Sequence, residues 1–597
     1  MEALRQGDVT LHYKKGDPRE IRNYRPITLL NVDYKILAHV LVKRLKTVMD
    51  DIISKEQLGF VPGREISEST LFLKLVQAKL EEDDLEGIIV ACDWEKAFDR
   101  VSWDYLHQAT KALGFGPYMC SWLKVLYNTD APPQRCIKSN GSRSDPFPIL
   151  SGVPQGCPAS PIIFLLVAEA LARAIVQDPK IKGIQIAGKE YKLTQFADDT
   201  QILLAGYKYL KRLWAVLTEY EDATGMKANA KKFEGLRCGA LVRKPIPLVP
   251  ELRTEVIKWV EKGDYVRILG IPFWESNQYD INIFYDTLYR KHKSLLAAWK
   301  DHHHLTIVGR GMLINSMVYG RFRYYIQVEP MPQRLVDAIV ADAQALAWGK
   351  EVDFDPEEEG TRLANRRFMI NEAQHLPRKG TLGAGILNWE KHVQALLISK
   401  LLKYRDGAGG QWKELLDNWL DRESSGRGAI FATHRLEDLI QSTHSSSAGE
   451  SKLPRIWKHA IRALQTLQLR PADPTHWSAD TARAMPVWYN PLFKIPKIKH
   501  EEFWRQTLRM NTIKDMVNDD MDNYSEEEVR SEIARLVTTE GSWTRVKSKE
   551  WVKTETLLKE WRRVMAAIPE RLLAAAREEV TIRGYSFVSQ RIMFLMG

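Results

Sequence analysis

The sequence predicts an α+β protein, because strand patterns alternate with helical patterns over the first 270 residues and helical patterns dominate the rest. Short apolar runs bounded by Gly, Pro and Asp indicate the strands, and apolar residues spaced by three and four indicate the helices. A chain of 597 residues is expected to contain several domains. Its apolar content of 44% is sufficient for their cores.

The first 240 residues contain most of the predicted strands. Residues 11–30 combine Lys and Arg with Gly, Asp and Pro, which predicts a turn-rich hairpin. Strands are predicted at 88–91, in a pair over 184–192, and on both sides of Asp198 and Asp199. Helices are predicted over 33–53, 68–82, 103–113, 117–127, the apolar run after Pro161, and 210–224 with Gly225 as C-cap.

A Pro-rich segment interrupts the pattern at 243–250, and beyond residue 270 the chain is predicted to be mainly helical. Segments 408–410 and 441–452 are candidate linkers. The tryptophans there either pack in helical cores or stack on bases. We expect four parts: 1–240, 241–350, 351–440, and 453–597.

Composition limits the classes of function. The net charge of +10, from 86 basic and 76 acidic residues, permits a polyanionic partner without requiring one. Five cysteines without a CxxC pair argue against a disulfide framework or a structural zinc site, and favour a reducing compartment. The N-terminus lacks the apolar core of a signal peptide. The apolar run from Ile162 is interrupted by Glu169 and Arg173, so we expect a buried helix, no membrane span, and a nuclear or cytoplasmic location.

Three aspartates stand at the ends of predicted strands. Asp93 ends a buried strand in "IIVACDWEKAFD", and Asp198 and Asp199 occupy a tight turn in "LTQFADDTQILLAG". If these strands are neighbours, three carboxylates converge, and divalent cations would relieve their repulsion. Two Mg²⁺ ions roughly 3.5–4 Å apart are a known arrangement for in-line phosphoryl transfer. The alternative is that the paired acids only serve the turn.

Two further features have both a functional and a plain interpretation. The loop "SGVPQGCPASPIIF" carries few side chains around Gln155, which lets a substrate approach closely, although it also suits a simple connector. The basic residues of the predicted hairpin suit a triphosphate, although they also suit a solvated surface; they are Lys14, Lys15, Arg22 and Arg25.

In their order, these pieces resemble the reverse transcriptase of non-LTR (LINE-type) retrotransposons. The matching segments are "YKKGDPREIRNYRPITLL", "EQLGFVPGR", "CDWEKAFDRVSW", "SGVPQGCPASPIIF", "FADD", "TGMKANAKK" and "VRILGIPF". Segments similar to the thumb and to the region after it follow, so the resemblance runs from about residue 11 to residue 410. It implies a right-hand polymerase with fingers, a palm holding a small antiparallel sheet, and a helical thumb.

The resemblance also implies residue roles. Asp93, Asp198 and Asp199 correspond to the catalytic metal ligands for two Mg²⁺ ions, with Mn²⁺ as a substitute, and Lys232 to a general acid. Phe98 corresponds to the steric gate against ribonucleotides. The remaining implied residues are the nucleotide contacts Lys15, Arg25, Gln155 and Gly156 and the primer grip Leu269 and Gly270.

The implied reaction is RNA-directed DNA synthesis, with an RNA template, a DNA primer and dNTPs as partners. Relatives carry a nicking endonuclease and a block upstream of "KKGD", and neither is recognisable here. We therefore expect a truncated element whose target is nicked by a partner protein. The alternative is a catalytically silent, retrotransposon-derived protein that binds nucleic acid.

Overall fold

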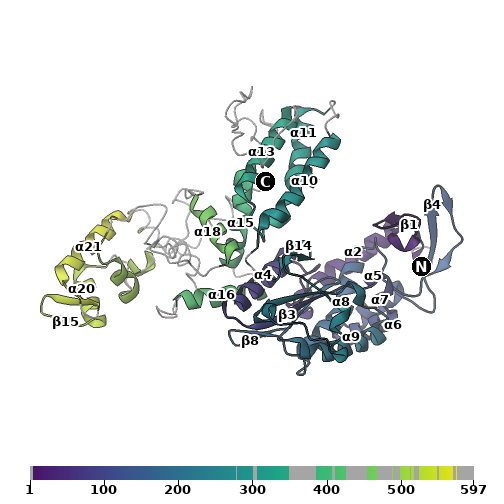
Figure 1. Cartoon of the computed structure of the whole chain (residues 1–597), viewed down its shortest axis with the longest axis horizontal. Helices are drawn as coiled ribbons and strands as arrows, with labels where there is room; N and C mark the ends of the chain where they lie inside the picture. The colour runs from purple at the N-terminus through teal and green to yellow at the C-terminus, as the bar shows by residue number, and fades with distance from the viewer. Residues whose placement is uncertain are drawn as a thin grey trace. The chain divides into compact units, whose positions relative to one another are not determined.

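The computed structural model describes residues 5–276, 279–299, 305–348, 385–405, 410–424, 454–466, 487, 496, 498–510, 513–516, 524–547, 550–568, 570 and 573. The chain forms two compact units, Met1–Phe284 with Gly409–Leu416, and Tyr285–Ala408 with Asp417–Gly597 (Figure 1). The predicted linker at 441–452 and the start of the predicted part 351–440 lie outside the described residues.

A five-stranded sheet forms the centre of the first unit. Its strand order is β12–β11–β3–β10–β9. The strands are β3 (Glu86–Cys92), β9 (Leu193–Phe196), β10 (Asp199–Leu204), β11 (Glu234–Gly239) and β12 (Lys258–Trp259). Strand β10 pairs antiparallel with both β3 and β9, and only β11 and β12 run parallel. The expected neighbourhood of the two aspartate-bearing strands is confirmed.

Helices α4 (Ile66–Glu82) and α8 (Ser160–Gln177) cover opposite faces of this sheet. On β9, Leu193 belongs to the hydrophobic core that contains α8. The next residue, Thr194, points the other way and its hydroxyl lies 3.1 Å from that of Ser69 on α4. Both faces are therefore buried, which explains why β3 reads as a continuous apolar run.

Helix α8 has the length and mean hydropathy (1.6) of a membrane span, but 67% of it is buried inside the protein. It packs against α6 (Trp103–Ala112) and α9 (Leu210–Thr224). Helix α9 ends at Gly225 with φ +73°, as the sequence predicted. The other α-helices that precede β9 in the chain are α2 (Val32–Lys46), α3 (Met49–Ile52), α5 (Ala97–Arg100) and α7 (Pro117–Leu126).

The predicted basic hairpin is present as β1 (Gly7–Tyr13) and β2 (Tyr24–Leu30), paired in antiparallel register. It belongs to a second five-stranded sheet, because β4 (Gln134–Ser139) pairs parallel with β1. The sheet is completed by β5 (Ser142–Arg143) and β6 (Phe147–Pro148). The sequence analysis missed these three strands: β4 pairs with β1, which is distant in the chain, and β5 and β6 are only two residues long.

Two hairpins complete the first unit. They are β7 (Ile184–Ile186) with β8 (Lys189–Tyr191), which was predicted, and β13 (Tyr265–Ile268) with β14 (Ile271–Trp274). Residues 410–416 also belong to this unit, where Glu414 forms an ion pair of 3.2 Å with Lys55.

The described part of the second unit is largely helical. Its helices are α10 (Ile281–Trp299, beginning in the first unit), α11 (Ile307–Leu313), a π-helix (Ile314–Tyr319), α12 (Gly320–Ile326), α13 (Gln333–Trp348), α15 (Trp389–Arg405), α16 (Gln411–Ser424, whose first turn lies in the first unit) and α18 (Arg455–Thr466). Trp389 and Trp457 are buried, as is Trp412 at the start of α16, so core packing is confirmed for these three.

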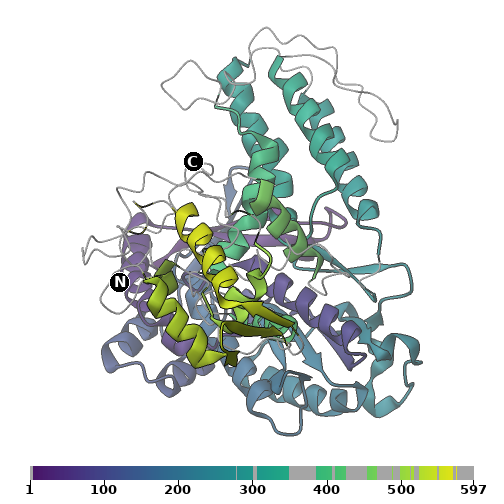
Figure 2. The same ribbon diagram turned by 90° about the vertical axis from the view of Figure 1, so that its left-hand side faces the viewer.

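Near the end of the chain, helices and a small sheet share one core (Figure 2). The elements are a π-helix (Phe503–Thr507), α20 (Glu526–Leu536), β15 (Thr539–Glu540), β16 (Trp543–Lys547), β17 (Glu550–Lys553) and α21 (Thr554–Ala567). The sequence predicted helix throughout this region and missed the three-stranded antiparallel sheet.

A buried histidine gives the second unit a predictable pH dependence. Burial, together with the charge of Arg323, lowers the pKa of His392 to about 4. Between this pKa and the ordinary histidine pKa of 6.5, the unfolded chain binds a proton at His392 that the folded unit does not bind. The contribution of neutral His392 to stability is therefore fully present above pH 6.5 and is lost as the pH falls toward 4. Between pH 7.5 and pH 5 we expect a loss of about 2 kcal/mol.

Hydrogen exchange of the α15 amides, corrected for intrinsic rates, measures this loss. His392→Phe keeps an aromatic ring beside Trp389, which packs on His392 at 5.8 Å between ring centroids. The variant should lose most of the pH dependence. An equal dependence in both proteins would show that another group is responsible.

Candidate active site

The three predicted aspartates stand at one end of paired strands. Cys92 pairs with Thr200 across β3 and β10. Asp93 follows the first of these residues and Asp199 precedes the second, so the two aspartates occupy facing positions beyond the pair. Asp198 lies in the two-residue turn that joins β9 to β10. The backbone thus brings the three residues to the same end of the sheet.

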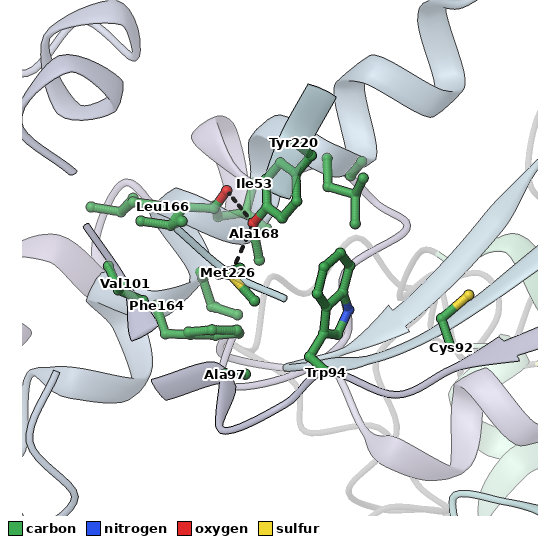
Figure 3. Close-up of a cluster of buried hydrophobic side chains, with 14 of the residues drawn as sticks. Ile53, Cys92, Trp94, Ala97, Val101, Phe164, Leu166, Ala168, Tyr220 and Met226 are labelled. Carbon is green, nitrogen blue, oxygen red and sulfur yellow. Dashed lines mark hydrogen bonds between the residues drawn. The ribbon is translucent and has the colours of Figure 1, made fainter. Parts of the chain in front are cut away.

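Asp93 is fixed by its buried neighbours. Cys92 is 4% exposed and Trp94 is 6% exposed, and the Trp94 ring meets Tyr220 edge-on at 5.4 Å between centroids (Figure 3). The backbone carbonyl of Asp93 also accepts a hydrogen bond of 2.8 Å from the Asn229 amide. The core therefore holds this backbone while the carboxylate between the two apolar side chains stays partly exposed.

The acid cluster concentrates negative charge at this end of the sheet. Burial raises the pKa of Asp198, and the charge of Asp93 adds to the effect. Burial and the charges of Asp198 and Asp93 raise the pKa of Asp199 to about 6. Asp199 keeps an exposed surface, so the neighbouring carboxylates contribute strongly to this rise in pKa. Such a cluster attracts cations.

Lys14 is a site residue to which the sequence analysis gave no individual role. Burial is the main cause that lowers the pKa of Lys14. The positive charges of Arg25, Lys15 and Lys232 lower it further, and the negative charge of Asp93 raises it. Lys14 and Arg25 in turn oppose the rise in the Asp198 pKa. The hairpin therefore brings cations to the acids. The run of basic residues in the hairpin sequence indicated a cationic site, but it did not indicate which of these residues lies nearest to the aspartates.

Lys232 forms an ion pair with Asp93, with 2.8 Å between Nζ and Oδ2. It ends the short 3₁₀ helix Ala230–Lys232. The Lys232 side chain is 54% exposed and the Asp93 side chain 40%. Water therefore weakens the ion pair, and breaking it costs little free energy. The sequence predicted Lys232 near the site, and the structure places it on a carboxylate.

Phe98 and Gln155 are brought together by the segment that follows Asp93. Phe98 stacks on Phe164 of α8 with centroids 4.4 Å apart and planes at 16°. Its carbonyl accepts a 2.7 Å hydrogen bond from the Val153 amide, which ties it to the loop 151–157. The Gln155 side chain donates to Asp99 Oδ1 at 3.3 Å. Asp99 is a second residue that the sequence analysis missed, although it stands next to Phe98.

Gly156 lies directly against the basic hairpin. Its φ is +123°, and a Cβ there would stand 2.2 Å from the carbonyl oxygen of Thr28 on β2. The Thr28 amide donates a 2.6 Å hydrogen bond to the Gln155 carbonyl. Only glycine allows this contact, which docks β2 and its Arg25 against the loop.

Residues 13–273 match the family model described as reverse transcriptase (RNA-dependent DNA polymerase). The chain carries a reverse transcriptase domain. The match includes the whole acid cluster, the loop 151–157 and the central sheet, which is the palm of a right-hand polymerase. The predicted α+β right-hand fold is thus confirmed.

Curated relatives confirm the expected resemblance to non-LTR retrotransposon proteins. The transposon TX1 uncharacterized 149 kDa protein of Xenopus laevis is 30% identical over 54% of this chain and 24% of its own length. The Pol polyprotein of the type-1 retrotransposable element R2 of Popillia japonica is 28% identical over 52% of this chain and 43% of its own. The chain thus spans less than half the length of these relatives.

Among solved structures, apo telomerase from Candida tropicalis is similar to this chain, with 11% identity over 58% of this chain and 63% of that one and a TM-score of 0.34.

The predicted primer-grip residues form the turn of a separate hairpin in the reverse transcriptase domain. Leu269 (φ +49°) and Gly270 (φ +83°) join β13 to β14. Strand β13 packs beside β11 of the palm sheet.

The donor set of the domain suits Mg²⁺, which prefers carboxylate oxygens. Burial and the neighbouring carboxylate charges raise the pKa values of Asp198 and Asp199, and a bound cation would compensate these charges. Among the residues the structure describes, no three His, Cys, Asp or Glu side chains form a ready-made metal cage.

Proposed function

We propose that the chain is an RNA-directed DNA polymerase that extends a primer 3′-OH with dNTPs on an RNA template. The observation that carries the proposal is the placement of Asp93, Asp198 and Asp199 at one end of the palm sheet, where burial and the neighbouring carboxylates raise the pKa values of Asp198 and Asp199. The reverse transcriptase domain supports the reaction class.

In the proposed mechanism Asp93, Asp198 and Asp199 would hold two divalent cations, with Asp93 and Asp198 as the more direct ligands. The cations would supply charge compensation for the attacking 3′-oxygen and the leaving pyrophosphate. The chain's own residues position the substrates. Lys14, Lys15 and Arg25 neutralise the triphosphate, and Lys232 leaves Asp93 to approach the pyrophosphate, where it can donate a proton.

The fingers hairpin and the loop 151–157 form the proposed nucleotide site. Asp99 orients the Gln155 amide, and Gly156 lets the hairpin approach. Leu269 and Gly270 are proposed to hold the primer. Catalysis then rests mainly on positioning and electrostatic stabilisation, as in other phosphoryl transfers.

Primer extension on poly(rA)/oligo(dT) with Mg²⁺ tests this function. We expect dTTP incorporation by the full chain and none by Asp198→Ala. Equal extension by both proteins would contradict the proposal.

The alternative is a silent protein that binds nucleic acid, and the Lys232–Asp93 ion pair favours it by occupying a ligand. Tight RNA binding without metal-dependent incorporation would support this alternative and exclude the polymerase.

A sugar-discrimination assay tests the proposed gate. Phe98→Ala removes the ring that stacks on Phe164, and we expect discrimination against ribonucleotides to fall about 10- to 100-fold. Comparison of kcat/KM for dNTP and rNTP measures this ratio. Phe98→Tyr keeps the ring and should keep the discrimination. An unchanged ratio in Phe98→Ala would remove the gate assignment.

A further inference from the structure

We propose that Gln57 is a positioning residue, which holds the Ala197–Asp198 turn so that Asp198 and Asp199 can bind divalent cations together. The inference rests on the proposed function in that it concerns the same carboxylates. It assigns a role to a residue in a different part of the chain, 140 positions away from the turn it holds.

The Gln57 side chain makes three hydrogen bonds, and all of them go to backbone atoms in or beside the turn. Its Oε1 accepts from the amides of Ala197 and Gly59, both at 2.8 Å. Its Nε2 donates to the Ala197 carbonyl at 3.1 Å. The side chain is fully buried, so water does not compete for these bonds. Both polar groups of the Ala197 backbone are thus bound by one amide.

Ala197 needs such support because its backbone is strained. Its φ is +58°, in the left-handed region that costs a residue with a Cβ about 1–2 kcal/mol. It occupies the first position of a two-residue hairpin turn, where glycine is favoured when φ is positive. Such strain persists only where surrounding contacts over-determine the conformation. The next two residues are Asp198 and Asp199.

The segment around Gln57 lies along β9, at the edge of the hairpin formed by β9 and β10. The Gln195 amide donates to the Glu56 carbonyl at 2.7 Å, and the Leu58 amide donates to the Gln195 carbonyl at 2.8 Å. A Cβ on Gly59 would stand 2.4 Å from the Ala197 nitrogen, so glycine is required for this approach. The segment therefore pairs with β9 and reaches the turn.

Arg64 fixes the other side of this segment. Its Nη1 donates to the Gln57 carbonyl at 2.7 Å and to the Ser54 carbonyl at 2.5 Å, and its Nη2 donates to the Ile53 carbonyl at 3.1 Å. The Arg64 side chain is 13% exposed. Arg64 thus fixes the backbone of the segment, and the Gln57 side chain in turn fixes the turn at Ala197.

A purely structural glutamine would also be buried and hydrogen-bonded, so the test must separate stability from metal binding. Gln77 is the matched control, because it is 1% exposed and its Nε2 donates to the Trp274 carbonyl, away from the acid cluster. Gln57→Ala and Gln77→Ala should both lower the melting temperature, since each leaves buried backbone groups unpaired.

Mn²⁺ binding to the full chain without nucleotide, followed by electron paramagnetic resonance, is the decisive readout. Asp198→Ala defines the background. We expect Gln57→Ala to weaken Mn²⁺ binding about 10-fold or more, as loss of an outer-shell support does, and Gln77→Ala to bind like the wild type. In Gln57→Ala, adding Ala197→Gly should recover part of the Mn²⁺ affinity without recovering the melting temperature, because glycine relieves the strain but restores no hydrogen bond.

Wild-type Mn²⁺ affinity in Gln57→Ala would overturn the inference, as would equal weakening by Gln77→Ala. Wild-type binding no stronger than that of Asp198→Ala would also overturn it. If Gln57→Ala weakens Mn²⁺ binding but the wild type extends no primer, the positioning role stands and the polymerase function fails. The two proposals therefore fail separately.

Discussion

Asp198→Asn is expected to lower primer extension by 100- to 1,000-fold, on the order of the loss seen when one preorganised electrostatic element is removed. Asn keeps the size of the side chain and can still accept a hydrogen bond. It removes the negative charge that the proposed cation site needs. The loss should appear in kcat, because the primer and template contact other residues.

The same variant is expected to be no less stable than the wild type. Burial and the charge of Asp93 raise the pKa of Asp198, so above that pKa the charged carboxylate opposes folding. A neutral side chain removes this penalty, and the melting temperature should stay level or rise. Asp222→Asn, at an exposed position of α9, is the control and should change neither quantity. A large fall in melting temperature for Asp198→Asn would mean that Asp198 serves folding instead.

Local sequence patterns predicted the elements that carry the acids. The apolar run before Asp93 became β3, the apolar residues after Asp199 became β10, and Gly225 ended α9. These features depend on contacts within a few residues or on strong apolar flanks. A continuous apolar run or a C-capping glycine records them directly in the sequence.

Local sequence patterns did not predict contacts between segments that are distant in the chain. Strand β4 carries few apolar residues, and its pairing with β1 follows from the docking of the hairpin. Gln57 stands in "EQLGF" without any local sign that its amide binds the turn at Ala197. Strands β15 to β17 are short and charged, so their period of two was hidden between helical stretches. Contacts between distant segments decided the first two cases, while β15 to β17 pair only with one another.

Gly156→Ala is expected to lower kcat/KM for dNTP about 100-fold, although the change adds only one methyl group. The new Cβ would stand 2.2 Å from the backbone oxygen of Thr28, which cannot move without shifting β2. The hydrogen bond between the Thr28 amide and the Gln155 carbonyl would be lost with it. Since β2 carries Arg25, the hairpin would withdraw its cations from the triphosphate.

The control for this variant is Gly141→Ala. Gly141 has φ +83° in the turn between β4 and β5, and a Cβ there meets nothing within 4 Å. Both variants therefore place alanine at a positive φ, and only one creates a collision. Gly141→Ala should lose about 1 kcal/mol of stability and keep its kcat/KM. If both variants lose activity equally, backbone strain and not the collision with Thr28 is the cause. If only Gly156→Ala loses it, contact between hairpin and loop is what forms the nucleotide site, because the palm sheet and its carboxylates are the same in both proteins.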